Sequence, residues 1–111
     1  MRTKTRIYIA GPMRGHANYN YPAFNAAAKR LRRLQYEVVN PAEVSEGFGN
    51  PEQLAADPAL LERVMRREIS KLAECDAIYL LPGWERSHGA RRELAAALTV
   101  GLEVVHDRRA R

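Results

Sequence analysis

Short apolar segments alternate along the chain with longer stretches in which apolar residues recur every three or four positions. The short segments have the length of β-strands and carry few charges, as is typical of strands covered on both faces of a parallel sheet; they are residues 7–10, 36–39, 77–81 and 103–106. The longer stretches have the periodicity of helices that lie on a sheet; they are residues 22–34, 58–73 and 94–100. Strands and helices in this order form right-handed parallel units. We therefore expect one α/β domain over residues 1–111, with helices on both faces of a four- or five-stranded parallel sheet of Rossmann-like, flavodoxin-like strand order 2-1-3-4.

Residues at the ends of these segments support the boundaries. Asp57 and Pro58 suit the N-cap and first turn of a helix, and Gly101 suits a helix end. The Asn-Pro pair at residues 40–41 is expected to stop the second strand. Residues 42–56 show little periodicity, so we expect a long loop there with about one helical turn. Long loops in compact domains are often functional, and this one is expected to act as a lid or to meet a neighbouring subunit.

Three loops are expected to meet at the carboxyl edge of the sheet, where open α/β sheets bind ligands. They follow the first three strands, at residues 11–15, from residue 40 onward, and at residues 82–93. The first loop places two glycines around Arg14, so that backbone N–H groups can approach an anion and the guanidinium can bind it through two hydrogen bonds. An ordinary turn with one surface arginine is the alternative, because the loop has neither the Walker nor the dinucleotide-binding glycine pattern.

Two acidic residues are candidates for chemistry at this edge. Glu68 falls inside the apolar stripe of the helix at residues 58–73, so it either reaches the edge of the buried face or is held in a pocket with a raised pKa. Glu93 ends the third loop, near a helix start whose dipole favours the ionised carboxylate. An ionised carboxylate that faces a sugar can act as a nucleophile or stabilise an oxocarbenium ion. The alternative for Glu93 is an ordinary acid in the first turn of a helix.

Composition limits the chain to one hydrophobic core and gives it a positive charge. It has 111 residues, of which 46% are hydrophobic, a net charge of +5 and a pI near 9.8. The basic residues gather mainly at residues 29–33, 66–67 and 108–111. Solvated helix faces explain this charge most simply; a field that attracts small anionic substrates and a nucleic-acid surface are the alternatives. No aromatic residues alternate with these arginines, so we do not expect a nucleic-acid partner.

The cysteine, Asp76 and the histidines are expected to have structural roles, and they predict no cofactor site. Cys75 is the single cysteine, so it cannot form an internal disulfide, and we expect it to pack at a helix end. Asp76 is expected to be a turn or capping group at the amino edge of the sheet. His16, His88 and His106 lack the spacing of a metal site, and we expect neither a metal nor another cofactor. No segment has the features of a signal peptide or a membrane span, so a cytoplasmic location is the default expectation.

Four motifs of the chain together resemble a known family. They are Ile-Tyr-Ile-Ala-Gly-Pro-Met-Arg-Gly at residues 7–15, Asn-Pro at 40–41, Cys-Asp-Ala-Ile at 75–78 and Ser-His-Gly-Ala-Arg-Arg-Glu at 87–93. Through them the chain resembles the nucleoside 2-deoxyribosyltransferase superfamily. More narrowly it resembles the small domain of unknown function DUF4406, whose nearest characterised relatives are the 2'-deoxynucleoside 5'-phosphate N-hydrolases. The resemblance covers nearly the whole chain, and Ser-x-Gly-Ala-x-x-Glu is its most specific element.

The resemblance implies that an N-glycosidic bond is cleaved or exchanged through a covalent sugar–enzyme intermediate. By position, Glu93 matches the nucleophile of the family and Tyr8 the residue that orients it. Glu68 matches a position where the relatives usually carry an aspartate that helps to protonate the departing base, and the glutamate is one methylene longer. The residues expected to bind the substrate are Gly11, Met13, Arg14, Gly15, Trp84, Ser87, Gly89 and Ala90. Of the aromatic residues, Trp84 or Tyr19 is expected to stack on the base.

We therefore expect an N-glycosidase that hydrolyses a nucleoside 5'-monophosphate. Transfer of the sugar to a second base is one alternative, although a phosphate-binding Arg14 favours hydrolysis, because the transferases of this superfamily typically use unphosphorylated nucleosides. A nucleotide-binding module without turnover is the other. The relatives are usually homo-oligomers in which a neighbour completes the pocket, so we expect at least a homodimer.

Overall fold

The computed structural model describes residues 4–44 and 56–107. In this part of the chain, parallel strands form one sheet in the order β2-β1-β3-β4. The strands are β1 (Arg6–Ala10), β2 (Glu37–Val39), β3 (Ala77–Leu80) and β4 (Glu103–His106). The predicted α/β class and strand order are therefore confirmed, and the described residues contain four strands, not five.

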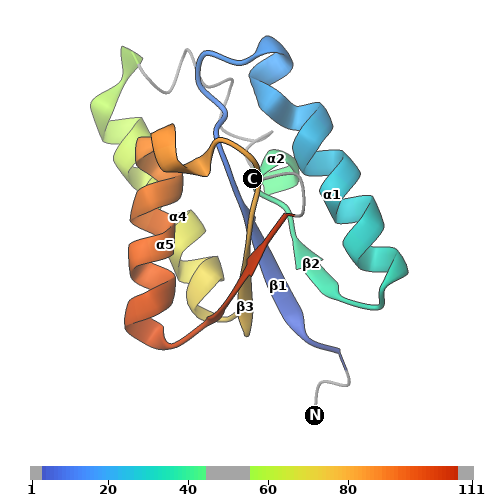
Figure 1. Cartoon of the computed structure of the whole chain (residues 1–111). Coiled ribbons are helices and arrows are strands. Elements are labelled where there is room, and N and C mark those ends of the chain that lie inside the picture. Colours follow the sequence, from blue (N-terminus) through green and yellow to red (C-terminus); the bar gives the residue numbers. More distant parts are fainter. Residues whose placement is uncertain (1–3, 45–55, 108–111) are drawn as a thin grey trace.

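Helices cover both faces of the sheet, as predicted. They are α1 (Tyr21–Arg33), α2 (Pro41–Val44), α4 (Pro58–Ala73) and α5 (His88–Val100), with the short 3-10 helices η1 (Ala17–Asn20) and η3 (Trp84–Arg86). Figure 1 shows α1 on one side of the sheet, and α4 and α5 together on the other. The first turns of all three helices gather with the loops that follow β1 and β3, at the top of the view. This edge is the carboxyl edge of the sheet, where the sequence predicts a ligand site.

Alternation along β1 decides which residues face this site. Ile7 and Ile9 pack with α1 in one half of the core, whereas Tyr8 and Ala10 pack in the other half, on the side of α4 and α5. All four residues are at most 1% exposed. Because side chains of a strand alternate between its two faces, the register of β1 fixes the Tyr8 ring between the sheet and the helix pair.

The segment after β2 differs from the prediction. The sequence predicts a loop over residues 42–56, but α2 occupies its beginning. Asn40 explains the helix: its buried side-chain oxygen accepts a hydrogen bond from the backbone N–H of Ala42 (3.1 Å), and its amide nitrogen donates to Oδ1 of Asn25 (2.9 Å). Residues 45–55, on which the predicted lid and helical turn fall, lie outside the described residues.

The last helix also begins earlier than predicted. The sequence predicts a helix from Leu94, with Glu93 near its start, but α5 begins at His88. Its N-cap is Ser87, whose Oγ accepts a hydrogen bond from the backbone N–H of Ala90 (3.1 Å). Glu93 is therefore the sixth residue of the helix and lies in its second turn. The alternative of an ordinary first-turn acid is wrong.

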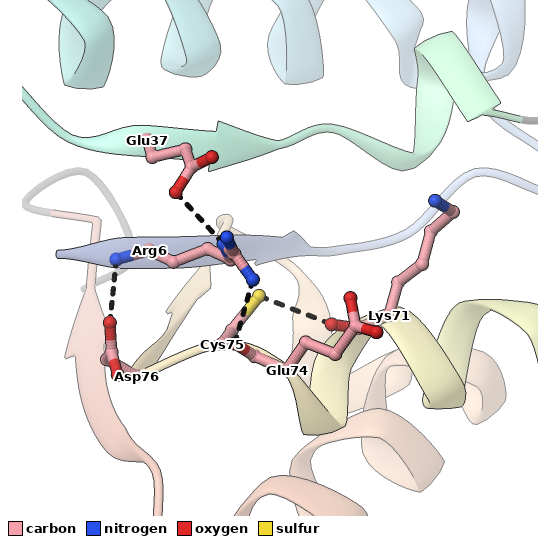
Figure 2. A network of polar contacts seen from close by, with 6 residues as sticks. All are labelled: Arg6, Glu37, Lys71, Glu74, Cys75 and Asp76. Atoms are coloured by element: carbon pink, nitrogen blue, oxygen red, sulfur yellow. Dashed lines mark hydrogen bonds and ion pairs between the residues drawn. The ribbon is translucent and has the colours of Figure 1, made fainter. Parts of the chain in front are cut away.

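A polar network fixes the opposite, amino edge of the sheet (Figure 2). The Arg6 guanidinium donates to Oε2 of Glu37 on β2 (3.0 Å) and to the backbone carbonyl of Glu74 after α4 (3.4 Å). The backbone N–H of Arg6 donates to Oδ2 of Asp76 (2.9 Å), which confirms Asp76 as a capping group at this edge. One arginine thus ties β1 to its neighbouring strand and to the end of α4.

Cys75 belongs to the core beneath this network. The side chain is 7% exposed, packs on the α4 and α5 side of the sheet, and donates from Sγ to the backbone carbonyl of Lys71 (3.4 Å). The predicted packing role at a helix end is therefore confirmed. Among residues 4–44 and 56–107, no helix is long and apolar enough to cross a membrane.

Candidate active site

A cavity of about 760 Å³ opens at the carboxyl edge of the sheet. Its volume lies in the usual range for small-molecule sites. Each of the three predicted loops contributes to its wall: Gly11 to Arg14 after β1, Pro41 after β2, and Pro82 onward after β3. The prediction that these loops converge on one site is therefore confirmed.

Two buried carboxyl groups line this cavity, and a tyrosine binds one of them from the sheet. Glu68 of α4 and Glu93 of α5 both line it and are 8% and 5% exposed. The hydroxyl of Tyr8 on β1 donates a hydrogen bond to Oε2 of Glu93. For Glu68 the structure decides between the two alternatives, because the side chain is held in a pocket and does not reach out to solvent. Residues from three separate elements thus form one polar cluster at the helix–sheet junction.

The electrostatics of this cluster differ from the prediction for Glu93. Burial raises the pKa of Glu93 well above its usual value of 4.5; the negative charge of Glu68 and a hydrogen bond with that side chain raise it further. The hydrogen bond from Tyr8 and the positive charge of Arg92 act in the opposite direction. The sequence predicts that the helix dipole keeps Glu93 ionised, but the dipole acts mainly within the first turn, and Glu93 lies beyond it.

Tyr8 remains a phenol under the same influences. Burial raises its pKa well above 10, and the charges of Glu93 and Glu68 add to this effect. The hydroxyl therefore stays a hydrogen-bond donor to the carboxylate over the whole physiological pH range.

Positive side chains also line the cavity. They come from the loop after β1, from η3 and from the beginning of α5; they are Arg14, His16, Arg86, His88 and Arg92. Arg14 is where the sequence predicts it. Arg86 and Arg92 were not predicted, because exposed arginines have the same appearance in a sequence whether they face a cavity or bulk water. Their closeness to Ser87 in the sequence is the signal that could have found them.

The beginning of α5 faces the same space. Ser87, Gly89 and Ala90 line the cavity, as predicted, and Ser87 also caps the helix. A Cβ at Gly89 would meet no atom within 4 Å, so the backbone there is open to a ligand. A helix N-terminus beside arginines suits an anion, because backbone N–H groups and the helix dipole both favour negative charge.

An apolar wall completes the cavity. It consists of side chains of α1 and α4 with two residues of the loops: Met13, Phe24, Pro41, Leu61, Val64 and Met65. Of these, only Met13 was predicted as a site residue. The sequence placed Val64 and Met65 on the buried stripe of their helix, but periodicity does not distinguish a side chain that packs on the sheet from one that lines a cavity.

Comparison with known families gives one match over this fold and site. The family model of a domain of unknown function, DUF4406, matches residues 5–106. The chain belongs to the DUF4406 family. Among the curated proteins none matches the sequence. The matched range includes all four strands and the three residues Tyr8, Glu68 and Glu93.

Four predicted site residues of this DUF4406 domain do not line the cavity: Tyr8, which reaches it only through its hydrogen bond to Glu93, and Gly15, Tyr19 and Trp84. The ring of Trp84 packs on the core beside α5, with its centroid 6.0 Å from that of His106. Tyr19 lies next to Tyr21, with ring centroids 5.9 Å apart, and Gly15 forms a turn with φ at +82°. The aromatic rings on the cavity wall are those of Tyr21 and Phe24. A base that entered the cavity would meet these rings and not Trp84.

The DUF4406 domain thus combines three chemical environments in one cavity. Its carboxyl pair can share a proton, so that one group acts as an acid while the other is an anion. The basic side chains that line the cavity suit a phosphate, and the apolar wall suits a flat ring. Within the described part of the chain, no three His, Cys, Asp or Glu side chains are grouped so that they could hold a metal ion.

Proposed function

We propose that this protein is an N-glycoside hydrolase that cleaves the base–sugar bond of a nucleoside 5'-monophosphate. The observation that carries the proposal is the buried pair of Glu68 and Glu93, with Tyr8 hydrogen-bonded to Glu93, in a cavity that basic side chains also line. An acid and a carboxylate in one site, beside an anion site, suit a substrate that has a glycosidic bond and a phosphate. The resemblance to the nucleoside 2-deoxyribosyltransferase superfamily supports the same reaction.

The proposed mechanism uses the two carboxyl groups in turn. The Glu93 carboxylate attacks C1' of the sugar while the protonated Glu68 gives its proton to the departing base. The C1'–N bond breaks, and an ester between the sugar and Glu93 forms. Glu68, now ionised, takes a proton from a water molecule that attacks C1' and releases Glu93. Two displacements at one carbon give net retention of configuration.

The shared proton of the pair sets the working state of this mechanism. Burial makes it costly to ionise both Glu68 and Glu93, so the pair holds one proton over a wide pH range. The reactive form has this proton on Glu68. Tyr8 favours that form, because its hydroxyl donates to Glu93 and stabilises the carboxylate there.

Arg14, Arg86 and the N-terminus of α5 form the proposed phosphate site. Arg14 and Arg86 come from the loops after two adjacent strands, β1 and β3, and the loop after β3 leads directly into α5. The hydroxyl of Ser87 uses its oxygen as the helix cap and keeps its hydrogen to donate to the phosphate. The apolar wall would then hold the base, with Phe24 and Tyr21 as its aromatic contacts.

One observation favours a second candidate, a nucleotide-binding module without turnover. Glu93 has a raised pKa, and a protonated carboxyl group is a poor nucleophile. Such a module would bind nucleotides in the same cavity and release them unchanged. Transfer to a second base remains the alternative reaction, and the homodimer implied by the resemblance stays a prediction.

The test is release of free base from a panel of ribo- and deoxyribonucleoside 5'-monophosphates, with and without an acceptor base. We expect turnover by the wild type and a loss of about a thousandfold or more in Glu93→Ala and Glu93→Gln, because no other group replaces the nucleophile. The matched control is Glu103→Gln, which changes an exposed glutamate at the far end of β4. Undiminished base release by folded Glu93 variants would exclude this mechanism, and binding without release would establish the module.

A further inference from the structure

Arg92 lines the same cavity as the carboxyl pair of Glu68 and Glu93 and has no part in the mechanism above. It directly precedes Glu93 on α5. Its side chain is 41% exposed, and its Nη1 lies 3.9 Å from Oε2 of Glu62 on α4. Glu62 in turn lies 3.6 Å from Nε of Arg66, one helical turn further along α4. The Arg92 guanidinium is thus held on the side of the cavity where α4 and α5 meet.

The carboxyl pair needs a positive charge nearby, because burial opposes its ionisation. Tyr8 on β1 binds Glu93 of this pair, and the other charged or titratable groups that line the same cavity are Arg14 and His16 after β1 and Arg86, His88 and Arg92 around the start of α5. An arginine suits this task, because its guanidinium stays charged at every pH at which the protein is folded. Arg92 is next to Glu93 in the sequence, and its charge lowers the pKa of Glu93.

We propose that Arg92 is a positioning residue that supplies the countercharge for Glu93, with Glu62 holding its guanidinium at the cavity. The proposal rests on the proposed function, since it concerns the ionised, nucleophilic form of Glu93. It distinguishes Arg92 from Arg14 and Arg86, which are assigned to the phosphate. An ion pair that only joined two helix surfaces would contribute little and would not affect Glu93.

The first test measures the charge coupling without any need for turnover. The carboxyl carbons of the glutamates are labelled with ¹³C, and the Glu93 signal is assigned by its absence in Glu93→Gln. In a pH titration followed by NMR, we expect Arg92→Gln to move the Glu93 midpoint upward by about one pH unit, because a nearby positive charge is lost. We expect Arg92→Lys to restore the wild-type midpoint to within about a third of that shift, because the charge returns.

Arg91→Gln is the matched control. Arg91 is an exposed arginine on the same helix, but it does not line the cavity. We expect the Glu93 midpoint to stay unchanged in this variant. An unchanged midpoint in Arg92→Gln, or an equal shift in Arg91→Gln, overturns the proposal, because the effect would then be absent or would belong to the general field of the protein.

The second test carries the same variants into the base-release assay. One pH unit corresponds to a tenfold change in the ionised fraction. On the acidic limb of the profile, we expect kcat of Arg92→Gln to fall about tenfold and to recover at high pH, and KM for the nucleotide to stay within about twofold. A loss that is equal at all pH values, or that falls on KM, overturns the positioning role. If no nucleotide is cleaved by the wild type, the proposed function fails, and the titration alone decides whether Arg92 governs Glu93.

Discussion

At the scale of single residues, the burial of the Glu93 carboxyl group lowers the stability of the fold. It is 5% exposed, and its nearest charged neighbour in the cluster is a second buried acid. Burying an acid disfavours its ionised form, and the structure offsets this only partly through Tyr8 and Arg92. A glutamine would fit the same space and could still accept the hydrogen bond from Tyr8. Stability therefore does not explain the acid, whereas the proposed reaction requires it.

This cost gives a prediction about stability and pH. The folded-state pKa of Glu93 is raised, so between about pH 4.5 and the folded-state pKa the native protein binds more protons than the unfolded chain, and its stability falls as the pH rises. Glu93→Gln removes this titration. We expect the variant to exceed the wild type in free energy of unfolding by about 1 kcal/mol or more at pH 8, and by little at pH 5.

Urea unfolding at the two pH values measures the difference. The variant retains the fold, so the slopes of the unfolding transitions should match those of the wild type. A variant whose advantage is the same at both pH values, or is greater at pH 5, would show that Glu93 is not buried with a raised pKa.

The sequence predicts the environment of Glu68 better than that of Glu93. Glu68 interrupts an apolar stripe, and such an interruption is visible in the helical periodicity. The pKa of Glu93 was not predictable, because it depends on burial beneath a neighbouring helix and on Glu68, which lies on a different element. For the same reason Arg92 and Arg86 were missed: the cavity that gives them meaning is formed by segments that are distant in the sequence.

At the scale of elements, the loop after β1 depends on how closely it approaches the end of β3. A Cβ built on Gly11 would lie 2.8 Å from Cβ of Leu81, closer than real contacts allow. Leu81 is 2% exposed and packs in the core, so it has little room to move. Gly11 is therefore required for its lack of a side chain, and this requirement places the loop with Arg14 against the start of the β3 loop.

Gly11→Ala should therefore destabilise the fold. We expect a loss of about 1–3 kcal/mol in the free energy of unfolding, because two adjacent strands must shift to admit one methyl group. Gly89→Ala is the matched control: a Cβ there meets nothing within 4 Å, and alanine is the better helix former, so stability should stay equal or rise. Thermal or urea unfolding of both variants decides the matter. Equal effects in the two glycines would contradict the close approach of the loops.

The boundaries of the elements show what local sequence can and cannot predict. Asp57 is the N-cap of α4, as predicted, because a capping side chain followed by proline is a local signal; its Oδ1 accepts from the Leu60 N–H (3.1 Å). The start of α5 was placed too late, since His88 and Gly89 are weak helix formers and the Ser87 cap outweighs them. Because of that error, Glu93 was predicted more than one helical turn too close to the start of the helix, and the environment predicted for its carboxylate was different.

At the scale of the whole molecule, the positively charged side chains fall into two groups that the net charge alone does not distinguish. Part of it serves the architecture, since Arg6 ties the amino edge and Arg32 forms an exposed ion pair with Glu43 (2.9 Å). Another part surrounds the cavity, where it favours an anionic ligand. The sequence gives the number of these charges, but only the fold shows which of them lie in structural contacts and which line the cavity.

One buried ion pair joins α1 to the rest of the molecule on the face opposite the carboxyl pair. Asp107 follows β4 and is 5% exposed; its Oδ2 accepts from Arg30 of α1 (3.0 Å) and from the hydroxyl of Tyr79 on β3 (2.9 Å). Three elements that are far apart in the sequence thus meet at one carboxylate. Removing this carboxylate is more costly than breaking a surface pair, because the Tyr79 hydroxyl stays buried without its acceptor.

Asp107→Ala should therefore lower the free energy of unfolding by about 1–3 kcal/mol, because the buried Tyr79 hydroxyl loses its acceptor and the partly exposed Arg30 guanidinium loses its ion pair. The matched comparison is Arg32→Ala, which breaks the exposed pair with Glu43 on the same helix, α1, and should cost less than about 1 kcal/mol. Urea unfolding of both variants measures the two costs under one condition. If the two losses are equal, Asp107 is an ordinary surface partner, and the attachment of α1 to the sheet rests on its apolar face alone; a larger loss for Asp107 makes this carboxylate the polar anchor of α1, on the side of the sheet that the site does not use.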